Sequence, residues 1–147
     1  MIYLYFSVSA ALLNYVLEGA GKEPTGQWVS LRELKNGKDW YRFFSHKCEN
    51  PLKKVADSYT DLFEDMLHIF NGQKVANHYE SDVSLVLYPL PRLPILICYW
   101  KPEDGLESSL NIFFDSTASD NLDVKFIYSL GTGLATMFEK IALRHGC

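Results

Sequence analysis

The sequence has few cysteines and little positive charge, and both shortages exclude functions. Only three cysteines occur in 147 residues, and no two of them form a C-x-x-C pair. This scatter argues against a disulfide framework or a cysteine zinc site and favours a reducing, cytoplasmic location. The formal net charge is −4, and Lys53 and Lys54 form the one basic cluster. The chain therefore lacks the basic face that nucleic-acid binding requires.

Long hydrophobic runs and catalytic motifs are also missing. Asn14 and Glu18 interrupt the apolar start of the chain, so it falls short of the ~20 apolar residues of a membrane span. It also lacks the basic segment of a signal peptide. There is no G-x-S-x-G, no H-x-x-x-H and no G-K-[ST], which leaves no sign of a nucleophile elbow, a histidine metal pair or a phosphate loop. We therefore expect no membrane contact and no metal site.

What is present is the composition of a globular protein. Apolar residues make up 48% of the chain, charged residues 22% and aromatic residues 14%. A chain of this length commonly forms one domain and can bury a core without disulfide bonds or bound metals. We expect residues 1–147 to form a single domain.

Several helices are expected in the first half of the chain. Ser30 and Glu33 have the S-x-x-E spacing of a capping box, which predicts a short helix. Asn50 and Pro51 are typical N-cap and first-turn residues, so another helix should begin at Asn50. Apolar residues recur at helical spacing over residues 59–70, the pattern of an amphipathic helix. Two further helices are predicted over residues 3–17 and residues 39–48.

The apolar period changes after residue 81. Three segments then have the composition of strands, DVSLVLY, LPILICYW and SLNIFFD, which cover residues 82–88, 93–100 and 109–115. Prolines at positions 89, 91 and 94 lie where the first two meet. Because proline removes a ladder hydrogen bond, we expect a stiff connector there.

The order of these elements predicts the fold class. A polar loop over residues 116–123 and a long helix from about residue 124 to residue 144, capped by Asp123, complete the chain. Gly131 and Gly133 lie within this helical pattern, which indicates helix packing. Helices, three consecutive strands and one long helix predict an α+β fold. We expect a three-stranded antiparallel meander packed against several helices.

Two arginines and a set of strand-end residues are the candidates for a binding site. Arg32 follows Trp28 by four residues, so the two side chains could stack. Arg92 lies among apolar residues and prolines, where its charged head must find water or a partner. Aromatic residues with arginines suit a planar or carboxylated small molecule. The predicted ligand-binding residues are Trp28, Arg32, Arg92, Trp100, Asp104 and Asp115. The alternative is that these residues form salt bridges and caps, with Asp115 bonding the amides of the following turn.

Three segments in order resemble a known bacterial family. They are LLNYVLEGAGKEPTGQWVSLREL, PLPRLPILICYW and NIFFDSTASDNLDVKFIYSLG, and they are similar to the domain of unknown function 3786. The resemblance covers residues 12–141 and implies a cytoplasmic protein associated with anaerobes. Some relatives carry an iron–sulfur segment with clustered cysteines, which this chain lacks. Family members also have residues before the first helix, so the chain looks like a short form whose uncovered sheet edge could pair in a homodimer.

Three functions stay open at this point. The first is a small-ligand or cofactor-binding accessory module. The resemblance implies a link to iron–sulfur or corrinoid-dependent anaerobic metabolism. The second is a protein-interaction or structural subunit without a ligand pocket, which an exposed aromatic patch would favour. The third is an enzyme that uses carboxylates such as Asp82, Asp104 or Asp115, which requires at least two of them to converge in a cleft.

Overall fold

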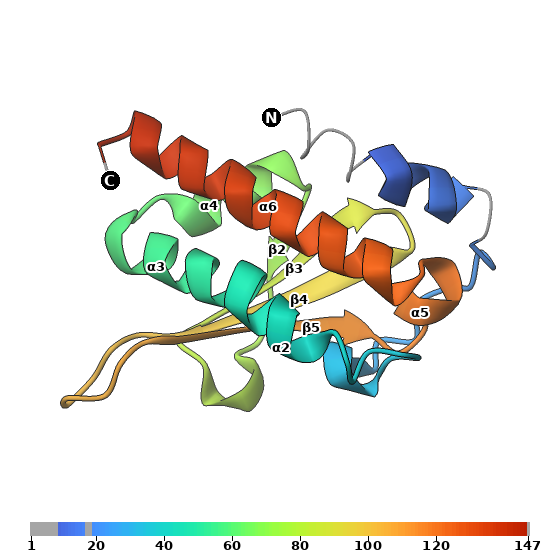
Figure 1. Ribbon diagram of the computed structural model, residues 1–147. Coiled ribbons are helices and arrows are strands. Elements are labelled where there is room, and N and C mark those ends of the chain that lie inside the picture. The colour runs from blue at the N-terminus through green and yellow to red at the C-terminus, as the bar shows by residue number, and fades with distance from the viewer. Residues whose placement is uncertain (1–8, 17–18, 147) are drawn as a thin grey trace.

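A five-stranded antiparallel sheet forms the centre of the computed structural model, which describes residues 9–16 and 19–146. The strand order is β1-β5-β4-β3-β2, and helices lie across the sheet (Figure 1). The strands are β1 (Trp28–Ser30), β2 (Gln73–Lys74), β3 (Val83–Leu90), β4 (Leu93–Trp100) and β5 (Ser109–Asp115).

The α+β class and the central meander of β3, β4 and β5 agree with the sequence prediction, but the predicted strand number was too small. The strands β1 and β2 have three and two residues, and each lies at one edge of the sheet. So short a segment carries no alternating pattern that sequence analysis can detect. Each of these two strands is defined by its pairing with a longer strand. Val29 of β1, for example, pairs with Phe114 of β5.

The proline-rich stretch is a tight hairpin, which is shorter than the connector that we predicted. Leu90 pairs with Leu93, so Pro91 and Arg92 form a two-residue turn between β3 and β4. Pro89 lies inside β3 where the register shifts between Leu87 and Leu90. An irregular ladder tolerates a residue that has no N–H donor.

The helical elements of the described residues all lie before β3 or after β5, and residues 9–16 are helical. The prediction for residues 3–17 lies partly outside the described residues. The longer helices are α3 (Asn50–Ser58), α4 (Leu62–Ile69) and α6 (Val124–Arg144). The short elements are η1 (Leu31–Glu33), α2 (Tyr41–Phe44), the π-helical η2 (Ser45–Glu49), η3 (His78–Glu80) and α5 (Ala118–Asn121).

Two predicted helix starts are confirmed in atomic detail. The Ser30 side chain accepts a hydrogen bond from the backbone N–H of Arg32, and Glu33 accepts one from the N–H of Ser30. These are the reciprocal contacts of a capping box. Asp123 accepts a hydrogen bond from the N–H of Lys125 and begins α6 at the expected residue.

Three helix predictions need correction. Asn50 is not an N-cap, because α2, η2 and α3 run on as one helix through residues 41–58. The N–H of Asn50 donates to the carbonyl of Ser45, a π-type bond whose wider turn makes room for Pro51. The amphipathic helix begins at Leu62 and not at Tyr59, which ends α3 in an extended conformation. The predicted polar loop contains α5.

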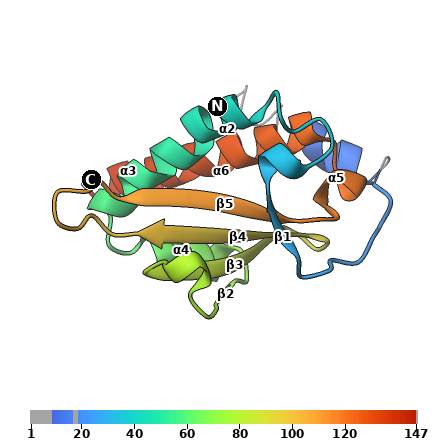
Figure 2. The ribbon, with the colours of Figure 1, turned by 90° about the horizontal axis from the view of Figure 1, so that it is seen from below.

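The main core lies between the helices and one face of the sheet, as the view in Figure 2 indicates. Alternate residues of β3, β4 and β5, such as Leu85, Ile97 and Ile112, are buried against apolar residues of α3, α4 and α6. Gly131 allows α6 to approach η2 and α2. A Cβ atom at Gly131 would lie 2.6 Å from Cε1 of Phe44 and 3.2 Å from Sγ of Cys48. This close approach agrees with the packing role that we predicted for the small residues of α6.

A smaller cluster lies on the opposite face of the sheet. Its buried members are Val86, Leu96 and Cys98, and Trp28, Val75, Trp100 and Phe113 pack against them. The segment around η3 covers part of this face, since the Tyr79 and Phe113 rings lie 4.9 Å apart. None of the helices in the described part of the chain is long and apolar enough to cross a membrane.

Candidate functional site

The six predicted site residues do not come together in one site. Trp28 pairs with Asp115 at one end of β5, and Trp100 pairs with Ser109 at the other end. Six residues of an extended strand separate these positions by about 20 Å. Asp104 lies beyond Trp100 in the exposed 103–106 turn. The two tryptophans therefore do not line one pocket.

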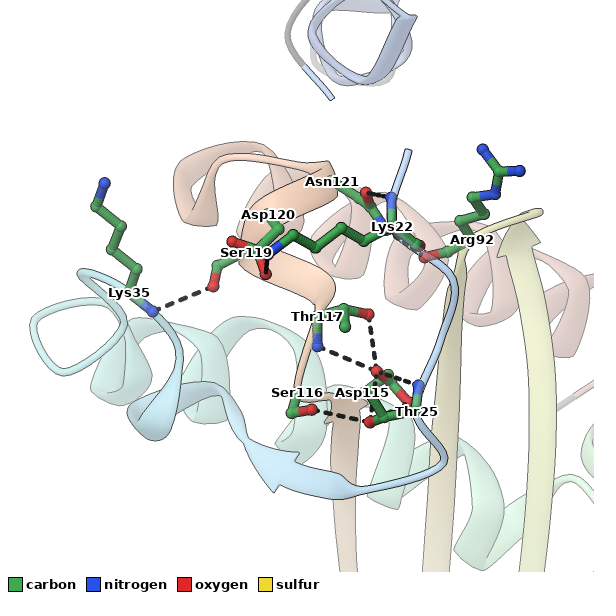
Figure 3. A network of polar contacts seen from close by, with 10 residues as sticks. All are labelled: Lys22, Thr25, Lys35, Arg92, Asp115, Ser116, Thr117, Ser119, Asp120 and Asn121. Carbon is green, nitrogen blue, oxygen red and sulfur yellow. Dashed lines mark hydrogen bonds and ion pairs between the residues drawn. The ribbon is translucent and has the colours of Figure 1, made fainter. Parts of the chain in front are cut away.

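Asp115 is buried and is surrounded by donors from its own chain (Figure 3). It accepts hydrogen bonds from the backbone N–H groups of Thr25 at 3.0 Å, Gly26 at 2.7 Å and Thr117 at 3.0 Å. The Thr117 hydroxyl donates another at 2.7 Å. Burial acts to raise the pKa of Asp115, but these donors outweigh it and hold the pKa below its usual value. The contacts favour the capping alternative, and they tie the loop before β1 to the turn after β5.

Asn121 continues this network, and sequence analysis did not select it. The buried side chain accepts a hydrogen bond from the N–H of Lys22 at 2.8 Å. It donates to the carbonyl of Lys22 at 2.9 Å and to the carbonyl of Arg92 at 3.1 Å. One amide side chain thus joins three segments of the chain (Figure 3). Its partners are backbone groups 99 and 29 residues away, so no local pattern could have indicated them.

Arg92 faces a carboxylate at the surface. Its guanidinium lies 2.8 Å from Oε1 of Glu23, and both side chains are largely exposed. The backbone N–H of Arg92 donates to the Tyr15 hydroxyl at 3.1 Å. Exposed ion pairs of this kind contribute about 0–1 kcal/mol to stability. These contacts hold the tip of the β3–β4 hairpin against Glu23 and Tyr15.

Arg32 has different surroundings, because it borders a hollow. Its guanidinium carbon lies 4.5 Å from the centre of the Tyr41 ring, in a cation–π contact. Arg32 and the outer side of the α2–η2 helix surround a cavity of about 700 Å³, within the size range of small-molecule sites. The lining residues of this Arg32 hollow are Arg32, Tyr41, Arg42, Phe43, Ser45, His46 and Asn50.

The Arg32 hollow combines positive charge with aromatic surface. Arg32 and Arg42 contribute two guanidinium groups, and Phe43 is 55% exposed. No carboxylate lines the cavity within the described residues. Guanidinium groups bind carboxylates through paired hydrogen bonds, and aromatic rings accept a planar apolar group. The lining therefore suits a small molecule that carries a carboxylate.

Glu49 lies behind this lining and is the most unusual polar residue of the described chain. It is 2% exposed, and its Oε2 accepts a hydrogen bond from the N–H of Ile112 at 2.7 Å. Its Oε1 is buried and has no hydrogen-bond partner within residues 9–16 and 19–146. Burial raises the pKa of Glu49, and the donors near it offset this rise only in part. Its neighbours in the sequence include the polar residues His46, Lys47 and Asn50, so sequence analysis gave no sign that Glu49 is buried.

The carboxylates considered for an enzyme lie in different surroundings. Asp82 accepts a hydrogen bond from the N–H of Lys101 at 2.7 Å, near the end of the sheet that carries Asp104. Asp115 is at the opposite end of β5. No cluster of three or more histidine, cysteine or acidic residues that could hold a metal ion occurs in the part of the chain that is described.

A second cavity, of about 560 Å³, lies at the start of α6. Its lining includes Lys35 and Lys125 together with Asp120 and Asp123. Asp123 already caps the helix there. Because the charges are mixed and the helix end is occupied, this cavity has no clear preference for an ion.

Comparison with known proteins supports the resemblance seen in the sequence. The family described as "Domain of unknown function (DUF3786)" matches residues 4–137. The chain belongs to this family. Searches of curated proteins and of solved structures gave no significant match. The DUF3786 assignment therefore accounts for the motifs around Trp28, Arg92 and Asp115, while its description assigns no reaction or ligand.

Proposed function

We propose that this DUF3786 protein is an accessory module that binds a small carboxylated molecule in the Arg32 hollow. The observation that carries the proposal is the guanidinium of Arg32 over the Tyr41 ring at the border of a 700 Å³ cavity. A second guanidinium, from Arg42, lines the same cavity. The ligand-binding roles of Trp28, Arg92, Trp100, Asp104 and Asp115 remain predictions, and they lie outside this cavity.

The proposed link to iron–sulfur or corrinoid-dependent anaerobic metabolism rests on the family resemblance alone. Within that proposal, the protein binds a metabolite or an organic cofactor fragment. The lining of the Arg32 hollow fits a molecule that has a carboxylate and an apolar group. The cytoplasmic location belongs to the same proposal.

Titration with benzoate tests the binding proposal, with neutral benzamide as the matched probe. We expect benzoate to shift the amide NMR signals of residues 41–50, and benzamide to shift them much less. Arg32→Ala should weaken benzoate binding by roughly tenfold or more, because a hydrogen bond to a charged group contributes about 1.5–3 kcal/mol. Arg144→Ala removes an exposed arginine at the far end of α6 and should leave the affinity unchanged. Equal binding of both probes, or no effect of Arg32→Ala, would contradict the proposal.

The alternative of a protein-interaction or structural subunit has one supporting observation. Leu12, Leu13 and Val16 on the helical segment of residues 9–16 are 43%, 59% and 75% exposed. Grouped apolar side chains at a surface are typical of interfaces. A concentration-dependent dimer in light scattering, together with no benzoate binding, would favour this alternative.

A further inference from the structure

The unpartnered oxygen of Glu49 calls for a physical explanation. A buried carboxylate is costly unless it is fully hydrogen-bonded. The Ile112 amide donates to Oε2 of Glu49, whereas Oε1 has no hydrogen-bond partner among the described residues, although the Ser45 and Asn111 side chains lie near the carboxyl. Glu49 also ends η2, the π-helical turn of an otherwise α-helical segment. Single π-helical turns inside α-helices occur frequently at functional sites.

Glu49 lies directly behind the lining of the Arg32 hollow. Ser45 is four residues earlier, so the two side chains are neighbours on the helix, and Ser45 lines the hollow. The Ser45 and Asn111 side chains are near enough to the carboxyl to oppose the rise in its pKa that burial causes. After burial, the charge of Glu49 is the largest cause that raises the pKa of Tyr41, another lining residue. The half-buried hydroxyl of Ser45 thus stands between the cavity and the buried acid.

We propose that Ser45 and Glu49 form the acidic inner end of the Arg32 hollow, and that its ligand is a small zwitterion with a carboxylate and an ammonium group. The ligand carboxylate binds Arg32 and Arg42 at the rim. The ammonium group donates to Oγ of Ser45, and the Ser45 hydroxyl turns its own proton to Oε1 of Glu49. This arrangement gives the unpartnered oxygen a donor without exposing it. Glu49 is a positioning residue here, because it acts through Ser45. The inference rests on the proposed function and names its ligand class.

Matched pairs of probes test this assignment in the full chain. The probes are glycine, β-alanine, 4-aminobutyrate and 5-aminovalerate, each compared with the carboxylic acid that lacks the amino group. Affinities are measured from amide NMR shifts of residues 41–50. For at least one chain length, we expect the amino compound to bind about tenfold more tightly, the effect of one charge-assisted hydrogen bond.

Three variants locate the preference. Glu49→Gln keeps an oxygen for the Ile112 amide but removes the charge, and Ser45→Ala removes the relay. Both should lower the preference for the amino compound to about threefold or less, while binding of the plain acids persists. Glu139→Gln, an exposed acid on α6, should keep the full preference. The ratio of two affinities in one variant is insensitive to a general loss of stability, and amide spectra confirm that each variant is folded.

The outcomes separate this inference from the proposed function. If the plain acids bind and the amino compounds bind no better, the zwitterion assignment is wrong and the carboxylate site stands. If the preference persists in both Glu49→Gln and Ser45→Ala, another group recognises the ammonium and the assignment is also overturned. If none of the probes and no benzoate bind, the proposed function itself fails.

Discussion

Replacing Asp115 by alanine should be among the most destabilising single changes in this protein. The carboxylate is 1% exposed and accepts from three backbone N–H groups and the Thr117 hydroxyl at 2.7 to 3.0 Å. Each such bond to a charged acceptor contributes about 1.5–3 kcal/mol, but bonds in one network do not add fully. Removal also leaves the amide donors without a partner, so we expect a loss of about 3–5 kcal/mol.

Urea unfolding at neutral pH measures this loss. Asp115→Asn keeps one acceptor oxygen and should cost less than Asp115→Ala, which provides a graded series if the alanine variant is too unstable to purify. Asp39→Ala serves as the control, because Asp39 is exposed and surface changes usually alter stability by less than about 0.5 kcal/mol. A loss below about 1 kcal/mol for Asp115→Ala would refute the argument that the loop junction depends on this side chain.

The pH dependence gives an independent check on Asp115. Its pKa is lowered in the folded protein, so its stabilising effect is present above the ordinary aspartate pKa and is lost as the pH falls through the lowered value. Asp115→Asn has no proton to gain at this position. The difference in unfolding free energy between wild type and Asp115→Asn should therefore shrink as the pH falls below about 4. A difference that stays constant with pH would show that the carboxylate charge is not responsible.

Two further changes test the core and the buried acid. Gly131→Ala would place a Cβ 2.6 Å from Phe44 and 3.2 Å from Cys48. We therefore expect urea unfolding to show that the free energy of unfolding falls by about 1–3 kcal/mol, despite the better helix propensity of alanine. Unchanged or higher stability would contradict the packing argument. Burial raises the pKa of Glu49 in the folded state from its ordinary 4.5, so the contribution of Glu49 to stability is greatest below its unfolded-state pKa and is lost as the pH rises through the folded-state pKa. Relative to wild type, Glu49→Gln should therefore gain stability as the pH rises from below 4.5 through the raised folded-state pKa of Glu49. Parallel pH profiles of the two proteins would contradict this expectation.

The contacts of the proline-rich stretch show how Arg92 is accommodated among apolar neighbours. Pro91 and Arg92 turn the chain between two strands, and the Arg92 guanidinium reaches Glu23 while its backbone is held by Tyr15 and Asn121. These contacts explain an arginine among apolar neighbours without a ligand. Arg32, the other predicted arginine, borders an open cavity.

Features with local causes could be predicted from the sequence alone. Asp123 predicted the start of α6, Ser30 with Glu33 predicted a capping box, and the apolar run of residues 93–100 predicted β4 to the residue. In each case the decisive interactions join residues a few positions apart, or the apolar pattern itself indicates which residues are buried. The family resemblance was also visible at this level, because it depends on motifs in order along the chain.

Features that depend on distant partners could be recognised only in the folded protein. The short strands β1 and β2 exist because β5 and β3 pair with them. Asp115 acts as a cap because the N–H groups of Thr25 and Gly26, 90 and 89 residues earlier in the chain, donate to its carboxylate. Glu49 is buried because packing of its helix against the sheet brings its carboxyl to the Ile112 amide, 63 residues later in the chain. Burial and long-range hydrogen bonds are properties of packed segments, and a pattern read along one segment cannot specify them.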